Sequence, residues 1–142
     1  MSKQSSFSHA SLTWLCQAIA KGSITAEELM DSSLHKIQSE NPRLNAVVCI
    51  NENSAREKAL EADRVRSKNK LWGPLHGIPM TIKDSLDSSG VVTTAGTIGR
   101  KNFIPKSDAT VVARLKAAGA ILIGKTNTPE LTLSFQTNNE IF

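Results

Sequence analysis

The 142-residue sequence predicts an α/β fold, because helical and strand-like segments alternate along it. Residues 120–123 are continuously apolar, which is typical of a strand inside a parallel sheet. Residues 78–83 indicate a second strand, since Ile78, Met80 and Ile82 recur with a period of two. Signals for helix ends lie before, between and after these strands.

Two helices are predicted near the N-terminus. The first covers residues 11–21 and ends at Gly22, a residue type favoured just beyond a helix C-terminus. The second begins at Thr25, which forms with Glu28 the T-x-x-E pattern of a capping box. The Asn-Pro pair at residues 41–42 is expected to end this helix, because the residue before a proline disfavours the helical conformation.

A strand over residues 44–50 and a third helix are predicted next. The strand is a short, largely apolar segment that begins two residues after Pro42. Ser54 and Glu57 repeat the capping-box pattern, so we expect the third helix to begin at Ser54.

Two further helices are predicted in the C-terminal half. Ser107 or Asp108 is expected to cap a fourth helix, which ends at Gly119. Thr128 followed by Pro129 predicts the start of a fifth helix, with threonine as the N-cap and proline in the first helical position.

The charge distribution argues against nucleic-acid and membrane partners. The formal net charge is +4, but the basic residues form no stripe. Their densest group, within residues 64–70, falls near the end of the third predicted helix, where cations favour the helix dipole. No apolar run approaches the length of a membrane span. We therefore expect a cytoplasmic protein without nucleic-acid or membrane partners.

The cysteines and histidines predict neither a disulfide nor a metal site. Cys16 and Cys49 are far apart and match no metal-binding or redox spacing, so they are expected to be reduced thiols. The three histidines, His9, His35 and His76, are isolated from one another and from both cysteines.

One segment matches the P-loop formula G-x-x-x-x-G-K-T, from Gly119 to Thr126. A phosphate-binding loop needs a strand before the first glycine and a flexible loop between the glycines. Here a predicted helix precedes Gly119, and residues 120–123 form a predicted strand. The pattern therefore argues against a phosphate cradle, and a nucleotide-binding module is the less favoured interpretation.

Three motifs carry a resemblance to a known family. They are G-P-L-H-G-I-P-M-T-I-K-D at residues 73–84, T-T-A-G at 93–96, and D-A-T-V-V-A-R-L-K-A-A-G-A-I-L-I-G-K-T-N at 108–127. In this order and spacing, the chain resembles the amidase signature family over residues 72–140. The resemblance implies an α/β/α fold around a mixed sheet, incomplete in this chain. Residues 1–70 would form a helical segment with one strand, and residues 71–142 the first part of the core.

The resemblance implies that Lys83 is the catalytic lysine. The family hydrolyses carboxamide C–N bonds with a Ser–cis-Ser–Lys triad through an acyl-enzyme, and it uses no metal or organic cofactor. The lysine must be unprotonated to accept a proton from the bridging serine. We expect burial on the strand, beside Ile78, Met80 and Ile82, to favour the unprotonated amine.

By the same resemblance, the Gly/Ser-rich segment that holds both serines lies downstream of Phe142. The serines near the motifs lack a Gly-Ser-Ser-Gly context and are not replacements: Ser85, Ser88, Ser89, Ser107 and Ser134. We therefore expect the N-terminal fragment of an amidase-signature hydrolase, inactive alone, whose full-length parent acts on a small-molecule amide. A sheet cut short would leave an exposed edge, which predicts self-association.

Two other interpretations stay open. The chain could be a non-catalytic remnant or interaction module, in which Lys83 is structural. An A subunit of glutamyl-tRNA amidotransferase is less expected, because residues 127–135 read N-T-P-E-L-T-L-S-F instead of a Met-Asp-Glu-Phe-like pattern.

The turn at residues 93–96 resembles a segment that lines the family's site, although an ordinary loop explains it equally well. Three asparagines could support the site, with turn and cap roles as the default: Asn127, Asn138 and Asn139.

Overall fold

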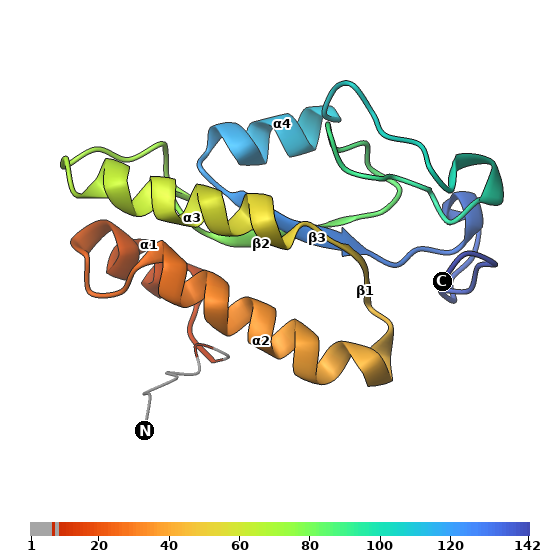
Figure 1. Cartoon of the computed structure of the whole chain (residues 1–142), viewed down its shortest axis with the longest axis horizontal. Coiled ribbons are helices and arrows are strands. Elements are labelled where there is room, and N and C mark those ends of the chain that lie inside the picture. The colour runs from red at the N-terminus through yellow and green to blue at the C-terminus, as the bar shows by residue number, and fades with distance from the viewer. Residues whose placement is uncertain (1–6, 8) are drawn as a thin grey trace.

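The computed structural model describes residue 7 and residues 9–142. It contains a three-stranded mixed sheet with helices on both faces, which confirms the predicted α/β class (Figure 1). The elements are α1 (Leu12–Lys21), α2 (Ala26–Leu44), β1 (Val47–Ile50), α3 (Glu52–Arg66), β2 (Pro79–Lys83), α4 (Thr110–Ala117) and β3 (Ile121–Thr126), with single 3₁₀ turns at Ile98–Arg100 and Glu130–Thr132.

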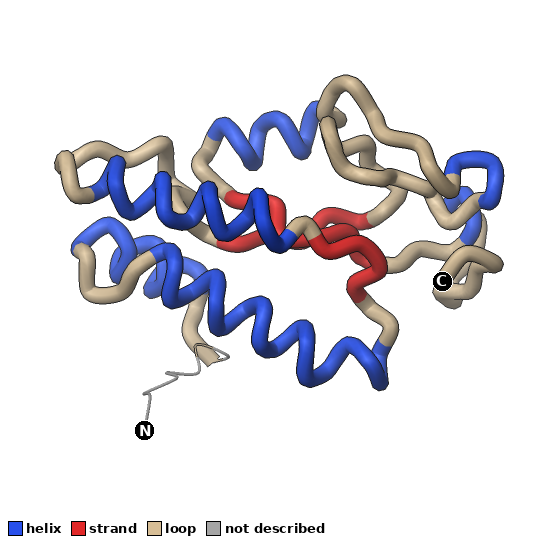
Figure 2. The backbone as a smooth tube through the Cα atoms, in the orientation of Figure 1, coloured by secondary structure: helices blue, strands red, loops and turns tan. Residues whose placement is uncertain are grey.

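The last strand in the chain, β3, is the central strand of the sheet (Figure 2). The strand order is β1-β3-β2, with β3 parallel to β2 and antiparallel to β1. Its first five residues are buried, as the apolar run at residues 120–123 predicted. Since β1 comes from residues 1–70 and both other strands from residues 71–142, the two segments share one sheet.

The two faces of the sheet are covered by different elements. On one face, α2 and α3 bury an apolar cluster with Ile121 and Ile123 of β3. On the other face, Val112 of α4 packs against Leu122 of β3 and Ile82 of β2. Figure 1 shows α4 and α2 on opposite sides of the sheet. Successive residues of β3 thus serve opposite faces, as strand geometry requires.

The caps of the first two helices agree with the sequence. Gly22 follows α1 with φ 74°, in the left-handed region that glycine tolerates without steric cost. At the start of α2, the Thr25 side chain accepts a bond from the Glu28 amide at 3.0 Å, and the Glu28 carboxylate accepts one from the Thr25 amide at 2.9 Å. The predicted capping box is therefore confirmed.

The predicted end of α2 is wrong, because the helix continues through Pro42 to Leu44. A proline in the last turn removes only one intrahelical bond. The Asn41 side chain then organises the exit, since its Oδ1 accepts bonds from the amides of Ala46 and Val47 at 2.8 Å each. As a result, β1 begins at Val47 instead of residue 44.

The predicted caps of α3 and α4 are also wrong. The helix α3 begins at Glu52, directly after β1, because the Asn51 amide still bonds to a carbonyl of β3 and its own carbonyl already accepts the first helical bond. The helix α4 begins at Thr110 without a side-chain cap. The Asp108 carboxylate instead accepts bonds from the Ser89 amide and from Lys116 Nζ, each at 2.7 Å.

The predicted fifth helix is absent from residues 128–142, which form a single 3₁₀ turn and irregular chain. Pro129 has an extended ψ of 157°, and Leu131 has φ 48°, so the backbone leaves the helical region within one turn. The Thr128 hydroxyl donates to the Pro129 carbonyl at 3.2 Å instead of capping a helix.

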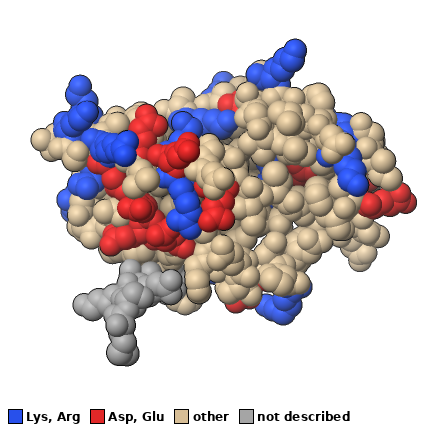
Figure 3. Space-filling model, viewed as in Figure 1, with Lys and Arg blue, Asp and Glu red and all other residues tan. Residues whose placement is uncertain are grey.

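The surface mixes charges of both signs. On the face shown in Figure 3, Lys and Arg side chains alternate with Asp and Glu, and no single-sign stripe is visible. Among the described residues, no helix is both long and apolar enough to cross a membrane.

Candidate functional site

Lys83, the sequence-predicted catalytic residue, is the last residue of β2. Strand alternation places its side chain on the face opposite the buried Ile82 and on the same face as the exposed Thr81. The side chain is half-buried, so it is less shielded than burial beside Ile78 and Ile82 had led us to expect. Within residues 7 and 9–142, Lys83 Nζ has no hydrogen-bond or ion-pair partner.

The chain turns immediately after Lys83 and forms a loop over residues 84–96, which we call loop 84–96. The Lys83 carbonyl accepts a bond from the Leu86 amide at 3.0 Å, which closes the first turn. The Asp84 amide donates to the Thr126 carbonyl of β3 at 2.9 Å, so the ladder between the strands continues past the end of β2. Lys83 is therefore followed at once by a firmly bonded backbone.

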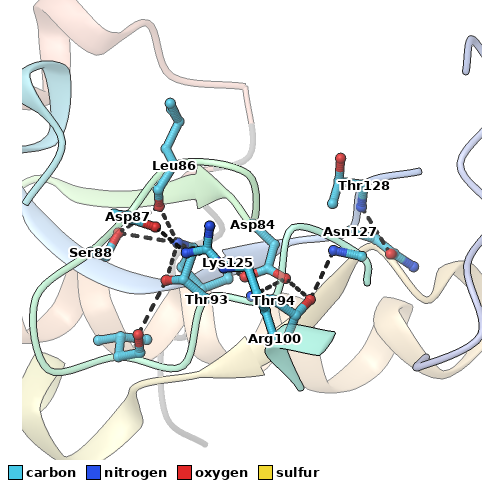
Figure 4. A network of polar contacts seen from close by, with 12 residues as sticks. Asp84, Leu86, Asp87, Ser88, Thr93, Thr94, Arg100, Lys125, Asn127 and Thr128 are labelled. Carbon is cyan, nitrogen blue, oxygen red and sulfur yellow. Dashed lines mark hydrogen bonds and ion pairs between the residues drawn. The ribbon is translucent and has the colours of Figure 1, made fainter. Parts of the chain in front are cut away.

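Asp84 is almost fully buried and holds the far end of the loop. Its Oδ2 accepts bonds from the Thr94 amide at 3.1 Å and from the Thr94 hydroxyl, and its carbonyl accepts one from the Ala95 amide at 3.0 Å (Figure 4). Its other oxygen, Oδ1, has no hydrogen-bond partner among the described residues and lies 3.9 Å from Lys125 Nζ.

Lys125, in β3, is fully buried and makes a complete set of hydrogen bonds to the loop. Its Nζ donates to the Leu86 carbonyl at 2.5 Å, the Thr93 hydroxyl at 2.9 Å and the Ser88 hydroxyl at 3.2 Å (Figure 4). An ammonium group has three donors, so all of them are used. Burial lowers the pKa of Lys125, and the nearby carboxylate of Asp84 opposes that shift.

A bulge in β3 directs Lys125 toward this loop. The pairing of β2 with β3 shifts between Met80 and Thr81, which leaves Ile123 as an extra residue on β3. Strict alternation would place Lys125 on the same face as Ile123, against α2 and α3. After the bulge, Lys125 lies opposite Ile82 and faces loop 84–96.

The sequence had singled out Lys125 only as the lysine of a P-loop pattern. In the structure, that segment is the central strand, paired on both sides, so its amides are committed to the sheet and do not form a phosphate cradle. A lysine inside a buried apolar strand was itself a signal, because lysine is almost never fully buried without partners.

The turn at residues 93–96, which ends loop 84–96, packs against the C-terminal segment. Ala95 and Gly96 both have positive φ values, of 53° and 69°. A Cβ at Gly96 would lie 3.0 Å from the carbonyl oxygens of Thr128 and Pro129, so this close approach requires glycine. The Leu131 amide donates to the Ala95 carbonyl at 2.8 Å, which ties the two segments together.

Among the described residues, none of the three predicted asparagines is hydrogen-bonded to Lys83. Asn127 donates to the Asn45 carbonyl at 3.1 Å, and its Oδ1 accepts a bond from Asn139 Nδ2 at 2.8 Å. Asn139 Oδ1 accepts bonds from the amides of Ile141 and Phe142. The Asn127 contact joins the segment after β3 to the end of α2, the Asn139 contacts to Ile141 and Phe142 are turn contacts, and Asn138 is exposed.

The remaining candidate groups form no second site in the described part of the chain. Cys16 and Cys49 are unpaired and half-buried, and burial raises the pKa of both thiols. Within residues 7 and 9–142, no three His, Cys, Asp or Glu side chains are grouped to hold a metal ion. The serines near the motifs are exposed or half-buried except Ser88, whose hydroxyl contacts Lys125.

Comparison with known proteins identifies the family. The family described as Amidase matches residues 28–142, which include β2, loop 84–96 and β3. The chain belongs to the amidase family. Over 124 residues it is 44% identical to the indoleacetamide hydrolase of Bradyrhizobium diazoefficiens, covering 87% of this chain and 24% of that protein. It is 42% identical over 126 residues to the glutamyl-tRNA(Gln) amidotransferase A subunit of Roseiflexus sp., covering 89% and 26%.

Solved amidase structures share the fold. The native peptide amidase of Stenotrophomonas maltophilia superimposes with a TM-score of 0.81 at 35% identity, over 87% of this chain and 26% of that one. A fatty acid amide hydrolase gives a TM-score of 0.91 at 22% identity over 99% of this chain, which supports the fold alone. The chain thus spans about a quarter of the length of the relatives that it matches.

Proposed function

We propose that this chain carries the lysine base of a carboxamide hydrolase, with Lys83 as the catalytic residue. The observation that carries the proposal is the contrast between two lysines inside the amidase match. Lys125 has all three donors committed to loop 84–96, whereas Lys83 stands half-buried at the end of β2 with no partner in the described part of the chain. An amine that must take up a proton needs access to its donor.

The chemistry follows from the Ser–cis-Ser–Lys triad that the family resemblance implies. Lys83, unprotonated, takes the proton of the bridging serine, which in turn takes that of the nucleophilic serine. The nucleophile's oxygen bonds to the amide carbon, the C–N bond breaks, and the proton returns through the bridging serine to the leaving nitrogen. Water then hydrolyses the ester.

Neither serine is supplied by residues 1–142, so this chain alone hydrolyses no amide. The substrate of the complete enzyme is a small-molecule amide, and no metal or organic cofactor takes part.

Fragment complementation tests this proposal. The chain is mixed with the part of the Stenotrophomonas maltophilia peptide amidase that follows its matching quarter, and hydrolysis of a simple peptide amide is measured. We expect no turnover by the chain alone and turnover by the mixture. Turnover by the mixture should be abolished by Lys83→Met. It should be retained with Lys68→Met, which removes an exposed lysine after α3. Turnover by the chain alone, or by a mixture that contains Lys83→Met, contradicts the proposal.

The edge of β2 also supports self-association of the isolated chain. The Ile121 amide donates to the Ile78 carbonyl, and the Asp84 amide to the Thr126 carbonyl. Backbone groups alternate along a strand, so the amide and carbonyl of Thr81 point away from β3, toward an edge that no described strand covers. Beside this edge, a groove of about 340 Å³ opens between α2 and the sheet, lined in part by Ile37, Leu44, Val47, Met80 and Ile123. An unpaired edge beside an apolar groove is a site for pairing with another chain.

A second candidate function is that of the A subunit of a glutamyl-tRNA(Gln) amidotransferase. It is favoured by the 42% identity to the Roseiflexus protein, close to the 44% identity to the indoleacetamide hydrolase. Complementation also separates these candidates, using the remaining three quarters of each relative. Turnover only with the portion from the Roseiflexus protein would favour the second candidate.

We place the complete enzyme in the cytoplasm.

A further inference from the structure

The proposed triad does not explain why Lys125 is buried. Its ammonium group is completely buried, and removing such an ion from water carries a large desolvation penalty even after relaxation. Among the described residues, the only carboxylate in ion-pair range is that of Asp84, and its nearest oxygen is 3.9 Å away. The bonds that offset the penalty go instead to three different residues of loop 84–96.

The contacts of Lys125 and Asp84 converge on neighbouring residues. Lys125 binds the hydroxyl of Thr93, while Asp84 binds both the amide and the hydroxyl of Thr94. Asp84 is the residue directly after Lys83, and its amide is bonded to β3. The two buried side chains therefore join the strand that carries Lys125, the end of the strand that carries Lys83, and the turn at residues 93–96. Figure 4 shows these groups gathered in one network.

We propose that Lys125 is a positioning residue, which fixes loop 84–96 and, through Asp84, the end of β2 that carries Lys83. Lys125 does not reach the reacting atoms, because it lies on the sheet face opposite Lys83. It acts by holding the turn at residues 93–96 in a fixed position relative to the backbone of Lys83. The inference rests on the proposed role of Lys83, but its test requires no hydrolytic activity.

The test uses the 142-residue chain and amide hydrogen exchange measured by NMR. In Lys125→Met, which keeps the length of the side chain and removes its donors, we expect exchange at the amides of Asp84, Thr94 and Ala95 to become about 100-fold faster. The amide of Ala59, in the middle of α3, should keep its wild-type rate. The matched control is Lys116→Met, which removes another lysine tied to this part of the fold, through Asp108, but makes no contact with the Lys125 network.

A second readout separates positioning from general stability. The pH profile of Lys83 acylation by acetic anhydride, followed by mass spectrometry, should change in Lys125→Met and stay unchanged in Lys116→Met. A purely structural role for Lys125 would leave this profile unaltered in the folded variant.

A double variant covers the case in which Lys125→Met fails to fold. Lys125→Met/Asp84→Asn removes both buried charges and leaves no uncompensated carboxylate, so it should fold and still exchange rapidly at Thr94 and Ala95. Wild-type exchange at these amides in either folded variant, or a Lys83 profile identical to wild type, overturns the inference. Failure of the proposed function would appear elsewhere, as absent hydrolysis in the complementation assay.

Discussion

Lys83 and Lys125 occupy comparable positions near the ends of two neighbouring parallel strands, yet their surroundings differ completely. Lys83 lies opposite Thr126 on one face of the sheet, half-buried and without a partner among the described residues. Lys125 lies opposite Ile82 on the other face, fully buried, with three hydrogen bonds and a nearby carboxylate. The comparison teaches that burial of a lysine is not itself a catalytic signature. A buried lysine with every donor satisfied stabilises structure, and one with free donors can exchange a proton.

The largest expected difference between the two lysines is in stability. Lys125→Met should lower the free energy of unfolding by about 3–5 kcal/mol, because it leaves the Asp84 carboxylate buried without a cation. Lys83→Met should change it by less than about 0.5 kcal/mol, since a half-buried side chain without partners contributes little. Urea unfolding followed by circular dichroism measures both. Equal effects for the two variants would remove the distinction between the lysines.

The loop that Lys125 holds offers a second comparison, between two glycines with positive φ. Gly96→Ala should cost about 2–3 kcal/mol, because its Cβ would approach the Thr128 and Pro129 carbonyls in addition to the backbone strain. Gly90 has φ 76° but open space around it, so Gly90→Ala should cost only about 1 kcal/mol. Thermal melting of both variants provides the comparison, and a Gly90→Ala effect as large as that of Gly96→Ala would show that packing of the turn is unimportant.

The strand that carries Lys83 differs from β3 in having an edge that no described strand covers. Thr81→Pro removes the outward amide and should weaken self-association about tenfold, while lowering the stability of the monomer by less than about 1 kcal/mol. Thr81→Val keeps the amide and serves as the control. Sedimentation equilibrium over a range of concentrations measures the association constant. Association of Thr81→Pro at the wild-type strength would place the contact elsewhere.

The smallest expected effect is a dependence of stability on pH. Burial lowers the pKa of Lys125 in the folded chain, so the unfolded chain binds more protons between that lowered pKa and the ordinary value of about 10.5. The free energy of unfolding attributable to Lys125 should therefore rise as the pH rises through this window. Urea titrations at several alkaline pH values should show this rise in the wild-type chain and lack it in Lys125→Met. An identical dependence in both chains would assign the effect to other groups.

Much of the fold was predictable because it depends on local chemistry. The capping box at Thr25 and the glycine after α1 involve residues within one turn of each other, and both predictions were confirmed. The apolar run at residues 120–123 predicted a buried strand, because only a strand covered on both faces is apolar throughout. The wrong predictions concerned helix ends and the fifth helix. Asp108 is of a residue type that often caps helices, but its carboxylate accepts bonds from the Ser89 amide and the Lys116 side chain instead.

The sequence by itself determined the α/β class, the buried strand at residues 120–123 and the motifs of the amidase family, because periodicity, caps and motif spacing are properties of neighbouring residues. Only the tertiary structure decided that Lys125 faces loop 84–96, since a one-residue bulge against β2 reversed the side that alternation would assign. The same holds for Asp84, whose partners lie ten and more residues away. The role of a buried charge depends on the groups that surround it, and those groups come together only when the sheet has formed.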